Sequence, residues 1–545
     1  MAAPATLCFV AVLALLGCVP ALFSGLAADD FVHAAVLGDP AIPDAAMFDA
    51  SALEITRPWW TDPDWHASFF RPLTVATHQL DHLLWPDAPW AMHLVSLGCY
   101  AALVLATAAV LRELGGPRWA MGLALWMFAL DDAHASTVAW IAARGTILAA
   151  VFGMLTLALH IRSRRRRGAL PFVALSSFVL ALASSEVAVC ALGYLIAYTR
   201  FVEPGTRKRW WAIAPYLAVA SAWLVTRALL GFGTGGTGLY VEPWSDPLGF
   251  AVLMGPRVAL LVASVLGVPL MLDPLAFFPG AELAAGLLSV CALLVLARLL
   301  VPVLRDDAIA RCFALGMVLS AIPLATTVPQ DRHTLLLGLG AFGLVSRVAL
   351  ALADGRLRSR MLRAIAWIWI GLHAVLGPLL LPLRSWTPAV LRQFTELTAR
   401  GLPEVVDEPT VLFAAPSDLH IMYTRALRRM QGRAHPDRFH TLYTGAFPVE
   451  VVRAGPRTLE LRAAGWSAAP MNRLFRAAPM RSGATFATSD FDAEVVATDA
   501  AGRATVVRFS FPCVLENCAI RWSSWAGDHS VASQPPREGE SLVVE

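Results

Sequence analysis

The stretch CFVAVLALLGCVPALFSGLA, residues 8–27, contains no charged side chain and is followed closely by two adjacent carboxylates, Asp29 and Asp30. A helix needs about 20 apolar residues to cross a hydrocarbon core that is roughly 30 Å thick. The stretch has that length and lacks the basic start of a cleaved signal peptide, so we interpret it as a membrane-spanning helix. The paired acid therefore lies where the chain leaves the membrane.

The same pattern continues until about residue 385. Of the 545 residues, 57% are hydrophobic and 15% are charged, with a mean hydropathy of +0.60. Long apolar blocks of this kind predict an α-helical polytopic membrane protein, because a soluble core would interrupt them with polar residues. The candidate crossings are 5–27, 91–111, 118–134, 138–161, 168–186, 187–200, 211–230, 283–304, 308–329, 333–353 and 361–383.

Lys and Arg are enriched in cytoplasmic loops, so the basic clusters predict the orientation of the chain. If all clusters lie inside, the N-terminus is cytoplasmic, the loop 28–90 is outside, and about eleven crossings place the C-terminus outside. The apolar run 248–271 must then fail to cross, and we predict a re-entrant or interfacial segment there. The clusters are 112–118, 161–168, 199–210, 298–311 and 354–363.

Two stretches resemble ligand-binding motifs but have simpler explanations. GFGTGGTG, residues 231–238, contains G-x-G-x-x-G but follows a membrane helix instead of a strand, which argues against a dinucleotide site. SRRRRG, residues 163–168, directly follows a crossing and is explained as a topology signal that meets anionic lipid. Membrane lipid is therefore an expected partner, and nucleic acid is not.

The composition changes after residue 384, which predicts a membrane domain over 1–384 and a soluble domain over 385–545. Short runs of alternating apolar and polar residues predict an extracytoplasmic β-rich, α+β domain, with one helix over 418–433. The predicted strands lie within 410–415, 450–455, 457–465, 494–511 and 518–522.

Cys513 and Cys518 lie in the polar tail. On the outer side of a membrane they can form a local disulfide, and the sequence does not choose between that bridge and two thiols. A metal site is disfavoured there, because no second ligand pair has suitable spacing.

The outer loop 28–90 is long and rich in Asp, Trp, Pro and His, which is typical of a functional loop. Its segment TVATHQLDHLL, residues 74–84, predicts an amphipathic helix along the membrane surface.

Ionisable residues at membrane depth are costly, so each one is a functional candidate. Carboxylates can remove a proton from an acceptor hydroxyl, and arginine binds phosphate oxygens through its planar fork, so the set indicates group transfer from a lipid-linked phosphate. Solvated residues at unrelated helix ends would give a similar set. The residues of one site would lie close together in the folded protein, whereas unrelated helix ends would not. The candidates at the outer ends of helices are Asp29, Asp30, Arg71, Asp131, Asp132, His134, Arg144, Glu186, Arg227, Asp331, Arg332 and His333.

Two longer segments carry a family resemblance. FFRPLTVATHQLDHLLWPDAPWAMHLVSL (69–97) and ALWMFALDDAHASTVAWIAARGTILAAVFGMLTLALH (124–160) resemble the membrane core of GT-C glycosyltransferases. The resemblance is to the group of protein O-mannosyltransferases and TPR-type transmembrane O-mannosyltransferases. There a paired acid follows the first helix, an R-P-L segment comes next, and H-P-x-H-x-E-x-V-A-W-I-x-x-R joins two helices. The resemblance covers roughly residues 5–350.

The resemblance implies roles for individual residues. Asp29 and Asp30 match the paired acid that contains the catalytic carboxylate. Arg332 matches the arginine of the family's E-R-Y segment, and Glu186 matches the glutamate of its K-E pair. Arg71, His134, Trp140 and Arg144 match the remaining motif positions. Arg332, Arg144, Arg227 and Arg71 are then candidates to bind the donor phosphate.

The sequence also departs from the family pattern. Asp131 and Asp132 replace the motif histidine and proline, and His333 replaces the tyrosine of E-R-Y. Ser136 and Thr146 stand where the family has acids, and Ser185 stands where it has the lysine of K-E. These changes remove a cation and two acids, and Asp131 and Asp132 restore negative charge nearby.

The resemblance and the candidate residues lead to two hypotheses. The first is an inverting enzyme of the bacterial inner membrane that moves a mannose-like hexose from a polyprenyl-phosphate donor to a protein, glycan or lipid acceptor outside. Asp29 or Asp30 would be the general base, and a divalent cation such as Mg²⁺ or Mn²⁺ stays open. The second is an inactive GT-C-like protein that binds a lipid-linked glycan or a partner protein. A transporter is disfavoured, because the halves show no internal pseudo-symmetry.

Overall fold

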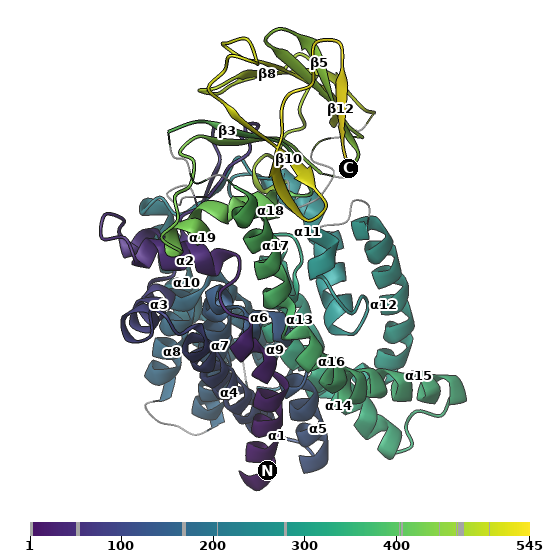
Figure 1. Ribbon diagram of the computed structural model, residues 1–545. Coiled ribbons are helices and arrows are strands. Elements are labelled where there is room, and N and C mark those ends of the chain that lie inside the picture. The colour runs from purple at the N-terminus through teal and green to yellow at the C-terminus, as the bar shows by residue number, and fades with distance from the viewer. Residues whose placement is uncertain are drawn as a thin grey trace.

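The structure is a computed structural model that describes residues 4–545 except 51–54, 166–169, 204, 206, 277–280, 403, 405–406, 446, 465, 467–472 and 501. Figure 1 shows a body of helices with a β domain at one end. The N-terminus lies at the opposite end of the helical body, and the C-terminus lies beside strand β12 (Ser541–Val544).

Each predicted crossing contains a helix, as expected for apolar chain that must satisfy its own backbone hydrogen bonds in lipid. Among the described residues, seven helices are long and apolar enough to span a membrane, and α8 and α13 contain shorter apolar segments. The predicted class of polytopic helical membrane protein is therefore confirmed. The helices of the body are α1 (Pro4–Gly17), α4 (Pro89–Leu114), α5 (Arg118–Ala129), α6 (His134–Ala139), α7 (Arg144–Arg165), α8 (Leu170–Ser184), α9 (Ala191–Phe201), α10 (Ala214–Leu229), α11 (Pro247–Val265), α12 (Ala281–Asp306), α13 (Ala308–Leu324), α14 (Thr334–Ala353), α15 (Arg360–Gly371) and α16 (Gly377–Arg384).

The body has a closely packed interior and an apolar exterior. α7 packs against α4 and α8, and α13 packs against α9 and α14. Small residues allow these close approaches. A Cβ on Gly193 of α9, for example, would lie 2.7 Å from the backbone nitrogen of Ser320 on α13. On α12, Leu287, Leu288 and Leu294 are exposed, as expected for a helix that faces lipid.

Helix α11 occupies the run 248–271, for which we predicted a segment that fails to cross. It is long and apolar enough to span, so its length does not decide the point. Trp244 and Phe250 at its start and Met271 and Asp273 after its end nevertheless line one cavity. The re-entrant or interfacial segment therefore stays a prediction.

The outer loop between α1 and α4 is folded. It contains the short helical turns η1 (Val19–Phe23) and η2 (Asp44–Phe48), helices α2 (Asp29–Leu37) and α3 (Pro72–Leu84), and strand β1 (His66–Ser68). The predicted amphipathic helix is α3. Strand β1 pairs in antiparallel orientation with β2 (Gly233–Gly235), so the GFGTGGTG segment anchors this loop.

In the described part of the chain, the C-terminal region folds into two sheets, which confirms the β-rich prediction. One sheet has the strand order β11-β10-β3-β4 and the other β12-β5-β6-β9-β8-β7. Helix α17 (Thr387–Gly401) leads from the helical body to the sheets (Figure 1). The remaining strands are β3 (Thr410–Ala415), β4 (Phe439–Thr444), β5 (Val449–Gly455), β6 (Thr458–Arg462), β7 (Thr485–Ala487), β8 (Asp492–Thr498), β9 (Ala504–Ser510), β10 (Arg521–Ala526) and β11 (His529–Ala532).

Two local details of this region refine the predictions. The single helix expected over 418–433 was wrong: the chain forms α18 (Asp418–Met422) and α19 (Thr424–Met430), with a break at Tyr423. Cys513 and Cys518 form a disulfide in the loop after β9.

Candidate active site

A cavity of about 1320 Å³ opens where the helical body meets the C-terminal domain. Side chains from the outer loop, from the ends of several body helices and from the α18–α19 region line it. Ligand pockets for one small molecule usually measure about 300–1,000 Å³, so this cavity has room for more than one substrate.

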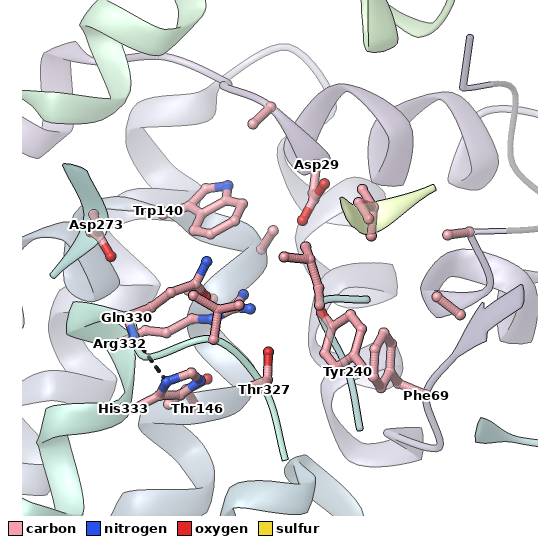
Figure 2. Close-up of a pocket in the computed structure, with 18 of the residues that line it drawn as sticks. Asp29, Phe69, Trp140, Thr146, Tyr240, Asp273, Thr327, Gln330, Arg332 and His333 are labelled. Atoms are coloured by element: carbon pink, nitrogen blue, oxygen red, sulfur yellow. Dashed lines mark hydrogen bonds between the residues drawn. The ribbon is translucent and has the colours of Figure 1, made fainter. Parts of the chain in front are cut away.

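The two adjacent carboxylates have different surroundings. Asp29 begins α2 and lines the cavity, and Figure 2 shows its carboxylate projecting into that space. Asp30 is 3% exposed and accepts hydrogen bonds from the backbone N–H groups of Ala27 (3.0 Å) and Ala142 (2.7 Å). Burial raises the pKa of Asp30 from 3.8 to about 7, although the two N–H donors act in the opposite direction. Asp30 therefore ties α2 to η3 (Ile141–Ala143), while Asp29 faces open volume.

Arg332 supplies an unpaired cation to the cavity. It lies in the turn η7 (Asp331–His333), directly before α14, and is half-buried. Its guanidinium carbon is 5.9 Å from the centre of the Trp140 ring. No carboxylate or other hydrogen-bond acceptor in the described part of the chain contacts its guanidinium group. Asp29 and Arg332 thus both line this cavity (Figure 2).

Two other arginines line the cavity but are paired. Arg71 donates from Nε to Glu186 Oε2 at 2.9 Å, and its guanidinium lies over the ring of Phe69. Arg227 donates from Nη2 to Glu242 Oε1 at 2.5 Å. Because a carboxylate already neutralises each of them, they attract a further anion less strongly than Arg332 does.

Other predicted site residues lie outside this cavity. Arg144 is fully buried, forms an ion pair with Asp81 (Nη2 to Oδ2, 2.5 Å) and donates to the carbonyl oxygen of Met92 at 2.8 Å. His134 is buried with its Nδ1 3.2 Å from the hydroxyl of Tyr100. These contacts hold α4, α6 and α7 together, so Arg144 and His134 have structural surroundings and do not face a ligand.

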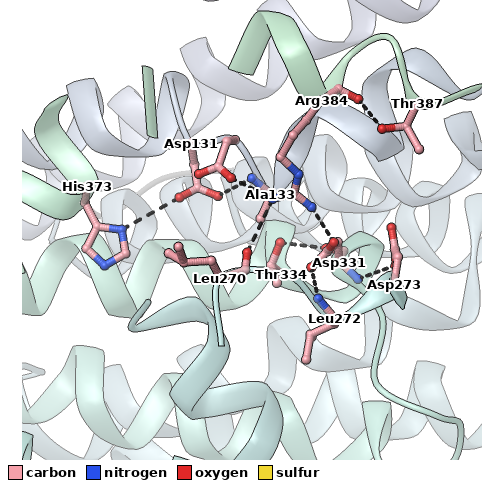
Figure 3. A network of polar contacts seen from close by, with 11 residues as sticks. Asp131, Ala133, Leu270, Leu272, Asp273, Asp331, Thr334, His373, Arg384 and Thr387 are labelled. Carbon is pink, nitrogen blue, oxygen red and sulfur yellow. Dashed lines mark hydrogen bonds and ion pairs between the residues drawn. The ribbon is translucent and has the colours of Figure 1, made fainter. Parts of the chain in front are cut away.

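A second polar cluster contains Asp131 and Asp132. Arg384 donates to Asp132 Oδ2 at 2.7 Å and to Asp331 Oδ2, and Asp131 lies 3.9 Å from His373 (Figure 3). The backbone N–H of Asp331 donates to Asp273 Oδ1 at 2.9 Å. We call Asp131, Asp132, Asp331, His373 and Arg384 the Arg384 network. It joins the loop before α6, the start of α14 and the end of α16.

Four of the six positions that depart from the family pattern line the cavity. Ser136, Thr146 and Ser185 all face it, and so does His333, whose Nδ1 accepts the N–H of Gln330 at 3.2 Å. The cavity therefore has small hydroxyl groups where the resembled family has charges.

Sequence reasoning missed several residues of the site. Tyr423 comes from the C-terminal domain and donates its hydroxyl to Asp29 Oδ1 at 2.6 Å. Asp273, Tyr240 and Glu242 also line the cavity. Tyr423 lies in a segment whose pattern indicated only a packed helix, so no local signal identified it.

The residues present do not fit a metal ion held by the protein. Among the described residues, no three His, Cys, Asp or Glu side chains converge closely enough to hold one. Asp29 shares its Oδ1 with a tyrosine hydroxyl instead of a second carboxylate. No role in this cavity is therefore assigned to a metal ion.

Comparisons with known proteins give structural likenesses only. No protein-family model matches the sequence, and no curated protein matches it. The Archaeoglobus fulgidus oligosaccharyltransferase tethered with an acceptor peptide matches with a TM-score of 0.41 and 14% identity, over 80% of this chain and 63% of that one. ArnT from Cupriavidus metallidurans bound to undecaprenyl phosphate matches with a TM-score of 0.40 and 12% identity, over 81% of this chain and 86% of that one.

A third match is AglB from Archaeoglobus fulgidus in complex with an inhibitory peptide and a dolichol-phosphate. Its TM-score is 0.43 at 13% identity, over 77% of this chain and 63% of that chain. This chain thus spans less than two thirds of the archaeal enzymes it matches. At these TM-scores and identities, the likeness assigns no activity to this chain.

Proposed function

We propose that this protein transfers a sugar, such as a mannose-like hexose, from a polyprenyl-phosphate carrier to a hydroxyl group of a protein, glycan or lipid acceptor. The observation that supports the proposal is the pairing of an accessible carboxylate, Asp29, with an unpaired arginine, Arg332, in one cavity beside apolar helices. A base for the acceptor and a cation for the departing phosphate are the two groups that this reaction needs.

The proposed step balances as an inverting displacement. Asp29 takes the proton of the acceptor hydroxyl as the acceptor oxygen attacks the anomeric carbon of the sugar. The bond between that carbon and the phosphate oxygen breaks, and the polyprenyl phosphate leaves with the electron pair. Arg332 stabilises its negative charge. The polyprenyl chain would lie on apolar residues of the cavity such as Phe250 and Trp244.

Orientation follows the positive-inside expectation and is part of the proposal. The cavity and the C-terminal domain would face the periplasmic side of a bacterial inner membrane, and the N-terminus would face the cytoplasm. The acceptor would then reach the cavity from the side of the C-terminal domain.

A second function has its own supporting observation. Ser136, Thr146 and Ser185 line the cavity at positions where the resembled family has charges, and Arg71 and Arg227 are neutralised by carboxylates. A cavity with fewer free charges suits a protein that binds a lipid-linked glycan without transferring it.

The two functions are separated by one assay with purified protein in lipid nanodiscs. Release of polyprenyl phosphate is measured from a panel of polyprenyl-phosphate sugars, with a membrane and periplasmic extract as the source of acceptor. Turnover by the wild type that is absent in Asp29→Asn supports the transferase. Saturable donor binding without turnover, in protein that stays folded, supports the binding protein.

A further inference from the structure

A side chain of the C-terminal domain contacts Asp29, the carboxylate that acts as the base in the proposed function. The hydroxyl of Tyr423 donates to Asp29 Oδ1 at 2.6 Å, across 394 residues of chain. The Tyr423 side chain is 6% exposed and lies at the break between α18 and α19, on the wall of the cavity. A solvated tyrosine on a domain surface would have no such fixed partner.

The surroundings hold Tyr423 in this place. The backbone carbonyl of Met422 accepts the N–H of Thr56, from the outer loop, at 3.0 Å. Helix α19 packs along α2, and Arg429 of α19 forms an ion pair with Asp39 just beyond the end of α2. Contacts at both ends of α2 therefore fix Asp29 relative to the C-terminal domain.

We propose that Tyr423 is a positioning residue: its hydroxyl fixes Oδ1 of Asp29, so that Oδ2 faces the hydroxyl of the acceptor. This inference rests on the proposed function, because it assigns a role within the same reaction. In the described part of the chain, no hydrogen bond to Oδ2 accompanies the one to Oδ1, so this oxygen is available to accept a proton.

The protonation state of Tyr423 agrees with a donor role. Burial, and after it the charge of Asp29, raises the pKa of Tyr423 well above its ordinary value. The phenol therefore keeps its proton at any working pH, which excludes it as the base. The nearby charge of Arg332 acts in the opposite direction, which shows that Tyr423, Asp29 and Arg332 share one electrostatic environment.

In a pH profile, the titration of Asp29 must be distinguished from the titrations of the groups near it. On α2 they are Asp30, with a pKa raised by burial to about 7, and His33, with a pKa lowered by burial to about 4. The groups that face this end of α2 and Tyr423 from other elements are Arg71, His78, Tyr240 and Arg332. Asp418 of α18 also lines the cavity, and burial raises its pKa to about 7. Asp30 and Asp418 are therefore both expected to titrate near neutrality, so the pH profiles are measured with and without Asp30→Asn and Asp418→Asn.

The first test is Tyr423→Phe, which removes only the hydroxyl, with Tyr443→Phe as the matched control in the same domain. We expect kcat to fall by about tenfold with little change in the KM for the donor, because orientation acts on the chemical step. The acidic limb of the kcat profile should move to higher pH, since the ionised carboxylate loses a donor. Tyr443→Phe should change neither. An unchanged kcat and an unchanged limb in Tyr423→Phe would overturn the inference.

A second variant covers the case in which Tyr423→Phe does not fold. Difluorotyrosine at position 423 keeps the ring and the hydroxyl but makes the phenol a stronger donor. The acidic limb should then move to lower pH than in the wild type, because a stronger donor favours the ionised carboxylate. A shift to higher pH, or no shift, would contradict the positioning role.

Failure of the proposed function has a separate signature. The Asp29 carboxylate band is followed by infrared difference spectroscopy, wild type minus Asp29→Asn, during a pH titration that needs no turnover. If no donor turns over but the band titrates at higher pH in Tyr423→Phe than in the wild type, the proposed transferase function is wrong, and the hydrogen bond between Tyr423 and Asp29 is supported. If the band titrates identically in the two proteins, the inference about Tyr423 is wrong whatever the activity.

Discussion

The cavity and the Arg384 network both collect charged residues at helix ends, yet their charges are arranged differently. In the network, Arg384 contacts carboxylate oxygens of Asp132 and Asp331, so these three charged groups are paired within the protein (Figure 3). In the cavity, Asp29 and Arg332 face open volume (Figure 2). Charge at membrane depth therefore does not by itself indicate chemistry. A charged side chain that is paired within the protein has a structural role, whereas one that faces open volume is available to bind a ligand.

Asp29 and Asp30 repeat this contrast at adjacent positions. Each oxygen of the Asp30 carboxylate accepts a hydrogen bond from a backbone N–H group. The Asp29 carboxylate accepts one hydrogen bond and otherwise faces the cavity. Successive residues of a helix point about 100° apart, so one neighbour faces the protein interior and the other faces the cavity.

The largest expected effect tests the structural side of the comparison. Arg384→Ala leaves two buried carboxylates without their cation and should destabilise the folded protein by about 3–5 kcal/mol. Thermal unfolding in detergent measures the change. The control is Arg521→Ala, which breaks an exposed pair with Glu408 and should cost only about 0–1 kcal/mol. Equal effects of the two variants would show that the network is not structurally distinct.

Arg332→Ala tests the ligand-binding side. Because no carboxylate in the described structure pairs with Arg332, its removal should leave the unfolding temperature nearly unchanged. Affinity for a polyprenyl phosphate in nanodiscs should fall by roughly 10–100-fold, the value of one charge-assisted hydrogen bond or slightly more. Arg332→Lys should recover part of this loss, since it keeps the charge without the planar fork. A drop in stability with unchanged affinity would place Arg332 with the structural group.

Asp30→Asn gives the smallest and most specific effect. Asn keeps one oxygen for the two N–H donors, so we expect a loss of about 1–3 kcal/mol in acid. In the wild type, burial raises the pKa of Asp30 from 3.8 to about 7. The stability from this group is therefore complete below the unfolded pKa and is lost as the pH rises through about 7. The difference in unfolding temperature between Asp30→Asn and the wild type should therefore be smaller at pH 8 than at pH 5. A difference that grows with pH would contradict the assignment.

Local sequence was sufficient for much of the fold. The length of an apolar run and the period of two in a strand are properties of consecutive residues, so the crossings and strands such as 410–415 were predictable. The break at Tyr423 was not, because it depends on contacts with the outer loop and with α2. Strands β7 and β11 are short edge strands whose pairing depends on their neighbours.

The site was predictable only in outline. The sequence placed Asp29, Arg71, Glu186, Arg227, Arg332 and His333 among the candidates, and all of them line the cavity. The sequence could not distinguish these residues from Arg144. Arg144 is paired with Asp81 on a helix of the outer loop, a contact that only the folded protein shows. Burial and pairing are set by tertiary packing, and no spacing in the sequence reports them.

In the reaction we propose, the two adjacent carboxylates have different roles: Asp29 faces the substrate and Asp30 holds α2 in place. Polyprenyl phosphate release by Asp29→Asn and Asp30→Asn, at equal amounts of folded protein, tests it most directly. We expect a loss of about 10²–10⁴-fold for Asp29→Asn, and near wild-type turnover for the folded fraction of Asp30→Asn. Retained turnover in Asp29→Asn together with loss in Asp30→Asn would contradict it.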